Sequence, residues 1–182
     1  MTASNDAFKK VETDSFVQTL CSPQPPDDPD FRGILINAPR EVEFRQDVKV
    51  GPFGAFAFIP ICGFFRLGVE SMPPSANDFC EAMRLVARHH ETNLKFTGPL
   101  VESPQRTVSQ SPSAAAEPPQ EADLPPGFAV GGYFNSNMAQ FLSLPQISAT
   151  YDIHVELGDR DADHFVISNT VTVTIKEVSD HD

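Results

Sequence analysis

The stretch that decides the fold is the last quarter of the chain, Tyr151-Asp-Ile-His-Val-Glu-Leu157 followed by Thr170-Val-Thr-Val-Thr-Ile-Lys176. Apolar and polar residues alternate one by one in both segments. A β-strand places successive side chains on opposite faces, so this alternation predicts two strands with one buried and one solvated face each. We expect them to form the closing hairpin of an antiparallel sheet. The residues expected to face the core are Tyr151, Ile153, Val155, Val171, Val173 and Ile175.

Earlier segments predict further short strands. They are Ile34–Ile36, Glu41–Val50, Phe53–Leu67 and Gly127–Asn135. The second of these alternates, whereas Phe53–Leu67 is apolar on both faces, as in a buried central strand. Pro60 and Gly63 predict a bend or bulge within that strand. The pair Gly131-Gly132 predicts a bulge or a close approach of two backbones.

Residues 75–88 fit two interpretations. Ser75 or Asn77 could cap a helix that has an acidic first turn. In the alternative, Met83, Leu85 and Ala87 alternate with arginines and start a β-hairpin. A polar turn at residues 89–93 and a return strand from residue 94 complete this second interpretation. We favour the hairpin from residue 83 onward because it agrees with the other strands.

Together the segments give about seven or eight short strands separated by turn signals, which is typical of a two-sheet sandwich. The ending Ala149–Gly158, a loop, then Ser168–Ile175 resembles the last two strands of immunoglobulin-like and fibronectin-like modules. Tyr151 resembles the tyrosine of a tyrosine corner. The resemblance covers mainly residues 128–178, and the core tryptophan of antibody domains is missing because the chain has no Trp. It implies an all-β fold, an immunoglobulin-like antiparallel β-sandwich.

Proline-rich stretches divide the chain into regions. Residues 1–30 are expected to be an N-terminal arm, partly disordered, in which Ser22–Asp30 holds four prolines. The sandwich domain is then expected to span residues 31–178. Within it, residues 102–127 are rich in Pro, Ser, Ala and Gln, so we expect a long flexible internal loop there.

Charge and composition exclude some classes of partner. The formal net charge of −12 would repel phosphate backbones and anionic membranes, so neither nucleic acid nor a membrane is an expected partner. The first ten residues lack the apolar stretch of a secretory signal. Phe53–Leu67 is too short and interrupted to span a bilayer as a helix. We therefore expect a cytoplasmic protein.

The three cysteines, Cys21, Cys62 and Cys80, are widely spaced and form no CxxC or Cys–His zinc pattern. Cys62 lies in an apolar run, as a buried small hydrophobic residue would. A Cys62–Cys80 disulfide is an open alternative. No cofactor-binding fingerprint occurs, and we expect no cofactor.

The final hairpin loop holds the candidate metal ligands. Asp159, Asp161 and Asp163 are spaced two residues apart, as in calcium loops that begin D-x-D-x-D. However, His164 stands where such a loop has glycine, and Thr170 where it has a bidentate acid. A second candidate for a divalent ion is the row Asp152, His154 and Glu156 on one face of a strand. A solvated acidic loop and a solvated strand face are the simpler interpretations of the two patterns.

No catalytic motif accompanies the strand pattern, so the sequence favours a non-catalytic binding or accessory module that mediates protein–protein interaction. Its expected contact site is the final loop, where the acidic residues would steer a partner. Arg160 and His164 would add polar contacts and Phe165 an apolar anchor. The alternative is a small metal-binding protein or enzyme that uses the acidic and histidine residues near this hairpin. Self-association into a homo-oligomer is a further expectation.

Overall fold

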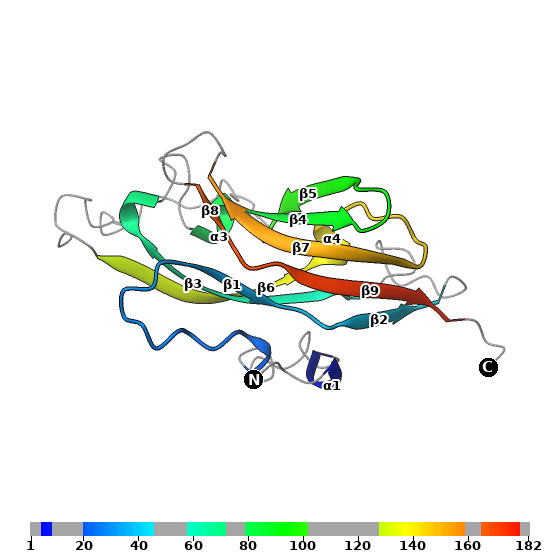
Figure 1. The fold of residues 1–182 in the computed structure, drawn as a ribbon, viewed down its shortest axis with the longest axis horizontal. Coiled ribbons are helices and arrows are strands. Elements are labelled where there is room, and N and C mark those ends of the chain that lie inside the picture. Colours follow the sequence, from blue (N-terminus) through cyan, green and yellow to red (C-terminus); the bar gives the residue numbers. More distant parts are fainter. Residues whose placement is uncertain are drawn as a thin grey trace, which may run out of the picture.

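The computed structural model describes residues 5–8, 20–45, 58–71, 79–101, 128–158 and 165–178. Their strands form two sheets that pack face to face (Figure 1). The smaller sheet has the strand order β1-β3-β6. The larger has the order β2-β9-β7-β4-β5, and β8 pairs with β7. The described part is therefore an all-β sandwich, which confirms the fold class predicted from the alternation.

The bounds of the elements follow the expected segments closely. The smaller sheet contains β1 (Gly33–Asn37), β3 (Pro60–Gly68) and β6 (Ala129–Asn137). The larger sheet contains β2 (Glu41–Phe44), β4 (Met83–His89), β5 (Lys95–Pro99), β7 (Ala149–Leu157), β8 (Val166–Ile167) and β9 (Val171–Glu177). The short helices are α1 (Asn5–Phe8), the 3-10 turn η2 (Val69–Ser71), α3 (Phe79–Ala82) and α4 (Met138–Phe141). The ambiguous region thus holds a short helix and then, as we favoured, a hairpin.

One strand pair departs from the antiparallel plan. β2 runs parallel to β9, with Val42 opposite Ile175, whereas every other pair in the described part is antiparallel. The chain leaves β1 through Ala38–Arg40, and Pro39 there has no N–H to continue the ladder. The chain therefore crosses to the larger sheet, where β2 runs in the direction of β9. The Thr174 N–H donates to the Arg40 carbonyl at 2.9 Å and fixes this crossing.

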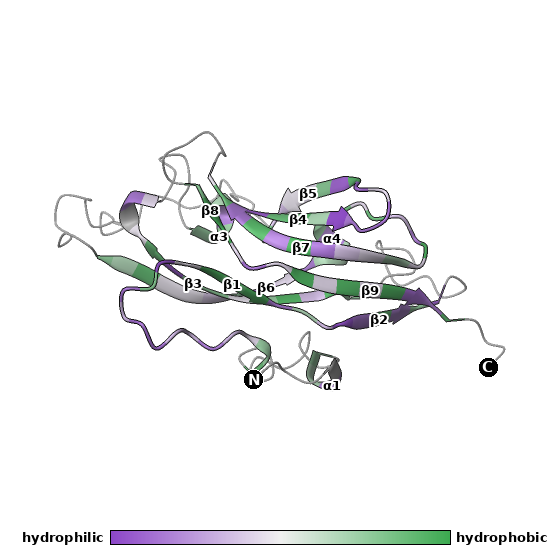
Figure 2. Cartoon of the chain, in the orientation of Figure 1, coloured by the Kyte–Doolittle hydropathy of each residue, from purple (hydrophilic) through white to green (hydrophobic). Residues whose placement is uncertain are grey.

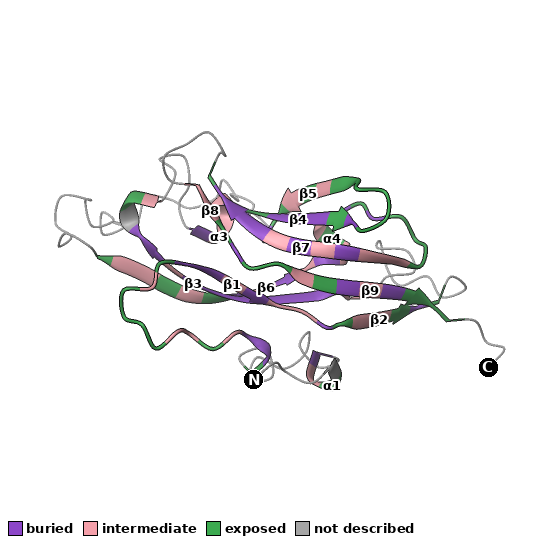
Figure 3. Ribbon diagram, in the orientation of Figure 1, coloured by how far each residue is buried: buried purple, intermediate pink, exposed green. Residues whose placement is uncertain are grey.

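The core lies between the two sheets and draws on both. β7 and β9 contribute the residues that alternation assigned to it: five of those six are fully buried, and Val171 is partly buried against them. Figure 2 shows the hydrophobic colour along β1, β3 and β9, while β2 is hydrophilic. Figure 3 shows that strands of both sheets carry buried residues. Burial at about 25 cal/mol per Å² of apolar surface is the main stabilising term of such a core.

The described central strand of the smaller sheet has a continuous register, so it contains no bulge at Pro60 or Gly63. β3 pairs with β6 without a skip from Pro60 to Gly68. Pro60 begins the strand, a position where its missing N–H is tolerated. Gly63 lies opposite Phe134, whose ring occupies the space that a side chain would need. Gly132 approaches the Phe65 ring in the same way, so the glycines make room for aromatic rings.

The segment before β1 lies across the outer face of the smaller sheet (Figure 1). Prolines cannot donate backbone hydrogen bonds, so carbonyls of this segment accept from side chains of the sheet instead. Asn37 Nδ2 donates to the Cys21 carbonyl at 3.0 Å, and Arg66 Nη1 donates to the Asp28 carbonyl at 3.1 Å. Cys21 also packs with Cys62 of β3 and with Phe8 in a small buried cluster.

The two sheets are joined by polar contacts just before β9. The Ile36 N–H of β1 donates to Asn169 Oδ1 at 2.7 Å, and Asn169 Nδ2 donates back to the Ile36 carbonyl at 3.0 Å. Ser168 makes the same double contact with Val155 of β7: the Val155 N–H donates to Ser168 Oγ at 2.8 Å, and the Ser168 N–H donates to the Val155 carbonyl at 2.9 Å. We call Ser168 and Asn169 the sheet junction.

Replacing Asn169 by Ala should lower the free energy of unfolding by about 1–3 kcal/mol, because it leaves the N–H and carbonyl of Ile36 without these partners. Urea-induced unfolding measures this. The neighbouring exposed Thr170→Ala is the control and should change stability by less than about 0.5 kcal/mol. Equal effects of the two changes would show that the junction is not a stabilising link.

Replacing Val155 by Asp should destabilise the fold by roughly 3 kcal/mol or more, because a carboxylate would be buried without a partner. The same substitution at Val178, which is 38% exposed, is the matched control and should have little effect. Thermal and urea unfolding of both variants provide the comparison. A mild effect at Val155 would contradict its assignment to the core.

Candidate functional site

The outer face of the larger sheet carries a group of polar side chains that come from four strands. Register places together the outward residues of four strands, because residues directly opposite each other share a face. We define the outer polar face as these residues: Arg84, Arg88, Lys95, Thr97, Thr150, Asp152, His154, Glu156, Thr172 and Thr174.

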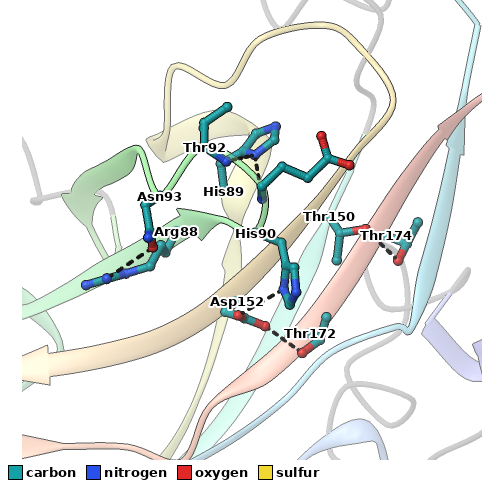
Figure 4. A network of polar contacts seen from close by, with 10 residues as sticks. Arg88, His89, His90, Thr92, Asn93, Thr150, Asp152, Thr172 and Thr174 are labelled. Atoms are coloured by element: carbon teal, nitrogen blue, oxygen red, sulfur yellow. Dashed lines mark hydrogen bonds and ion pairs between the residues drawn. The ribbon is translucent and has the colours of Figure 1, made fainter.

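At one end of this face, Asp152 lies between a histidine and a threonine (Figure 4). The hydroxyl of Thr172 donates to Asp152 Oδ1 at 2.7 Å, and His90 Nδ1 lies 3.3 Å from Asp152 Oδ2. Nearby, the hydroxyls of Thr150 and Thr174 are 3.2 Å apart. β7 and β9 supply four of these side chains, and the turn after β4 supplies His90.

The turn between β4 and β5 is held by His89. Its Nδ1 accepts from the N–H groups of Glu91 and Thr92, both at 3.2 Å, so the ring proton resides on Nε2 in the neutral ring. Asn93 has φ 61°, a conformation that asparagine tolerates better than most residues. Arg88 Nη1 donates to Asn93 Oδ1 at 3.4 Å. His89 is thus a structural residue of the turn, and His89 and His90 point to different partners.

In the middle of the face, His154 and Glu156 form a pair that is nearly buried. His154 Nε2 lies 2.9 Å from Glu156 Oε1, and Lys95 Nζ lies 3.7 Å from the same oxygen. The histidine and glutamate side chains are 12% and 11% exposed. The sequence pattern predicted that Glu156 lies on a solvated strand face. It faces outward as predicted, but it is buried and paired, which alternation alone does not reveal.

The arrangement on this face does not fit nucleophilic catalysis. A histidine base must contact the hydroxyl or thiol that it activates. Here Asp152 separates His90 from Thr172, and no histidine in the described ranges hydrogen-bonds to a hydroxyl or thiol. Two of the three thiols, Cys21 and Cys62, are equally unsuited. Burial, together with nearby Cys21, raises the pKa of Cys62 to about 12, and burial raises the pKa of Cys21, so both stay protonated.

The second candidate for a metal site is the row Asp152, His154 and Glu156 on β7. Asp152, His154 and Glu156 share a face as predicted, but Asp152 turns to His90 and Thr172 while His154 contacts Glu156. Among the described residues no three His, Cys, Asp or Glu side chains are grouped to hold a metal ion. Within the described part the side chains of this row therefore do not converge on one point, which fits the simpler interpretation of a polar strand face. The alternative of a Cys62–Cys80 disulfide is wrong, since none of Cys21, Cys62 and Cys80 forms a disulfide.

The final hairpin loop is described only in part. Asp159, Arg160, Asp161, Asp163 and His164 lie outside the described residues, so their predicted metal-binding and partner-binding roles stay predictions. Gly158 enters the loop with φ 84°. Phe165 is half-buried where the description resumes. The strand β8 follows directly, and its Ile167 lies opposite Glu156 with 49% of its surface exposed.

The exposed charge of the outer polar face is basic. Arg84 and Arg88 are exposed, and the side chain of Lys95 is 37% exposed. Both carboxylates of the face, Asp152 and Glu156, are engaged by histidines or by this lysine. In a chain with a formal net charge of −12, this is a local reversal of sign. This basic cluster cannot be recognised from sequence spacing, because Lys95 joins Arg84 and Arg88 only through the pairing of β4 with β5.

Comparison of the chain with protein families, with curated proteins and with solved structures finds no match. The helices of the described part are all too short or too polar to cross a bilayer.

Tyr151 does not form a tyrosine corner. In a tyrosine corner the phenol donates to the backbone a few residues upstream. Here Tyr151 is fully buried, and its hydroxyl has no hydrogen-bond partner among the described residues. Its ring instead contacts His89 at 5.4 Å and Phe96 at 6.0 Å, both edge-on. Burial also raises the pKa of the Tyr151 phenol.

Replacing Tyr151 by Phe should therefore leave stability unchanged or raise it by about 1 kcal/mol, because it removes a buried donor without a partner and keeps the ring. Calorimetric melting of the variant measures this. Tyr133→Phe, at an exposed position, is the control and should be neutral. A clear loss of stability at Tyr151 would show that its hydroxyl makes a hydrogen bond after all.

Proposed function

We propose that this chain is a non-catalytic immunoglobulin-like module that mediates protein–protein contact through the outer polar face. Its partner would carry acidic groups where it meets Arg84, Arg88 and Lys95. A cytoplasmic location fits three cysteines that form no disulfide, since reducing compartments disfavour disulfide bonds.

The strand order supports the immunoglobulin-like part of the proposal. In such modules, strands A, B and E share one sheet and strands C, F and G the other. Here β1, β3 and β6 correspond to A, B and E, and β4, β7 and β9 to C, F and G. β5 then takes the place of the extra strand beside C in variable-type domains. The described residues contain no strand D, and the tyrosine-corner hydrogen bond is absent, so the likeness is in strand order alone.

The single observation that carries the binding role is the basic cluster on an acidic protein. Arginine is enriched in protein interfaces because its planar head makes several hydrogen bonds and its stem buries apolar surface. Arg84 and Arg88 are separated by an even number of residues on β4, so both guanidinium groups project from the same face of one strand. Ile167 supplies an exposed apolar contact on the same face.

Electrostatics would make such contact selective. The bulk of the protein repels acidic partners, so only one that presents its acids to this face gains attraction. Such pairing orients the encounter and depends on salt, because exposed charges are screened within about 8–10 Å at physiological ionic strength. His90, whose side chain is 63% exposed beside the cluster, adds a further polar contact.

Reversing the charge of both arginines, Arg84→Glu with Arg88→Glu, should abolish capture of specific partners from an extract of the source cells. The control is the same change of charge away from the face, Arg32→Glu with Arg45→Glu, at two other exposed arginines. Immobilised full-length chains are compared by quantitative mass spectrometry at low and high salt. The proposal expects proteins that are lost with the first pair only and weaken with salt.

Equal capture by both double variants and the unchanged chain would contradict the proposal. That result would favour the final hairpin loop, where the sequence predicts a contact site made of Phe165 and the acidic residues before it.

A further inference from the structure

The outermost strands of the two sheets differ in how they are protected. An edge strand exposes unpaired N–H and C=O groups, and proteins blunt such edges with charges, prolines or short strands. β5 carries Lys95 and Pro99, and β2 carries two glutamates in four residues. β1 has five residues. β6 has nine residues, Ala129-Val-Gly-Gly-Tyr-Phe-Asn-Ser-Asn137, without a charge or a proline.

The far edge of β6 is open. β6 pairs with β3 on one side along its full length, and no strand of the described part pairs with its other side. In an antiparallel ladder alternate residues direct their N–H and C=O groups away from the partner strand, so about four residues of β6 point to this edge. The first half of the strand, from Ala129 to Tyr133, is exposed or half-buried.

The side chains beside the edge favour association. Tyr133 is 52% exposed, and its ring packs on Phe64 of β3 at 5.3 Å. The guanidinium of Arg66 lies over the Phe64 ring, 5.7 Å from its centroid, and helps to hold the aromatic pair in place. Phe128, just before β6, is 41% exposed. Gly131 has no side chain to obstruct an approaching strand.

We propose that β6 pairs with β6 of a second copy of this chain, antiparallel about a two-fold axis at Gly132. The same strand then serves as both halves of the interface, as a two-fold dimer requires. This register places Tyr133 of each copy opposite Gly131 of the other, and an aromatic ring covering a cross-strand glycine is a known stabilising pair. The two three-stranded sheets become one sheet of six strands.

Charge explains why a second copy meets the protein at this edge. Two copies of a chain with net charge −12 repel each other over most of their surface. β6 is uncharged, so the backbones can approach there at the lowest electrostatic cost. Strand pairing by itself buries less than the roughly 1,200 Å² of a standard interface, so the dimer is weak and concentration-dependent. It uses the smaller sheet and is independent of the binding role proposed for the outer polar face.

Sedimentation equilibrium of the full chain over increasing concentration tests this pairing. The unchanged chain should form dimers, and the double variant Gly131→Lys with Tyr133→Lys should stay monomeric. These lysines reduce the net negative charge, so a loss of dimer would come from the edge and not from overall repulsion. Leu94→Lys, at an apolar residue 59% exposed in the β4–β5 turn, is the control and should still dimerise. Circular dichroism checks that each variant is folded.

Photo-oxidative cross-linking gives a readout that does not depend on a charged variant. The chain has two tyrosines, and Tyr151 is fully buried, so a covalent dimer with dityrosine fluorescence reports Tyr133 next to its copy. Diagonal neighbours across an antiparallel pair are within reach of aromatic side chains. Tyr133→Phe should keep the dimer in sedimentation but lose the dityrosine signal, while Tyr151→Phe should keep both.

Two results would overturn the proposal. One is an unchanged chain that stays monomeric at every concentration, as it would if another segment of the same chain occupied the edge. The other is a dimer that the two lysines leave intact, which would place the interface elsewhere.

Discussion

The sandwich depends on the sheet junction formed by Ser168 and Asn169. Sheets in a sandwich share an apolar core, which is non-directional and does not by itself fix how one sheet lies on the other. Asn169 pairs with the N–H and carbonyl of Ile36 as a neighbouring strand residue would, and Ser168 does the same with Val155. These directional contacts set the position of β1 over β7 immediately before β9 begins. The first strand can then cross between sheets after Ile36 and run parallel to β9.

The same principle explains the segment that crosses the outer face of the smaller sheet. A proline-rich stretch cannot join a ladder, yet its carbonyls can accept from Asn37 and Arg66. Cys21 of the segment packs against Cys62 of β3, so the segment covers part of this face. The far edge of β6 receives no such cover from the described residues. The smaller sheet is therefore protected on its face and open at one edge.

Alternation predicted the strands well, because burial of one face imposes a period of two on β7 and β9. It also separated the β4–β5 hairpin from a helix. It could not predict the parallel pair, since direction depends on where the chain crosses between sheets. It placed Glu156 on the outward face but did not reveal that this side chain is nearly buried and contacts His154 and Lys95. Gly63 suggested a bend, but its role is to admit the Phe134 ring from another strand. Alternation within one segment carries no information about contacts with segments that are distant in the sequence.

The distribution of charge connects the two proposed surfaces. With acidic residues in excess by twelve, an uncharged strand and a basic cluster are the two kinds of surface that remain attractive at short range. The strand has no charged side chain, and its main-chain groups suit another strand of the same kind. The cluster of Arg84, Arg88 and Lys95 instead selects by sign. Because these surfaces lie on different sheets, one chain can pair with its copy and still present the outer polar face to an acidic partner.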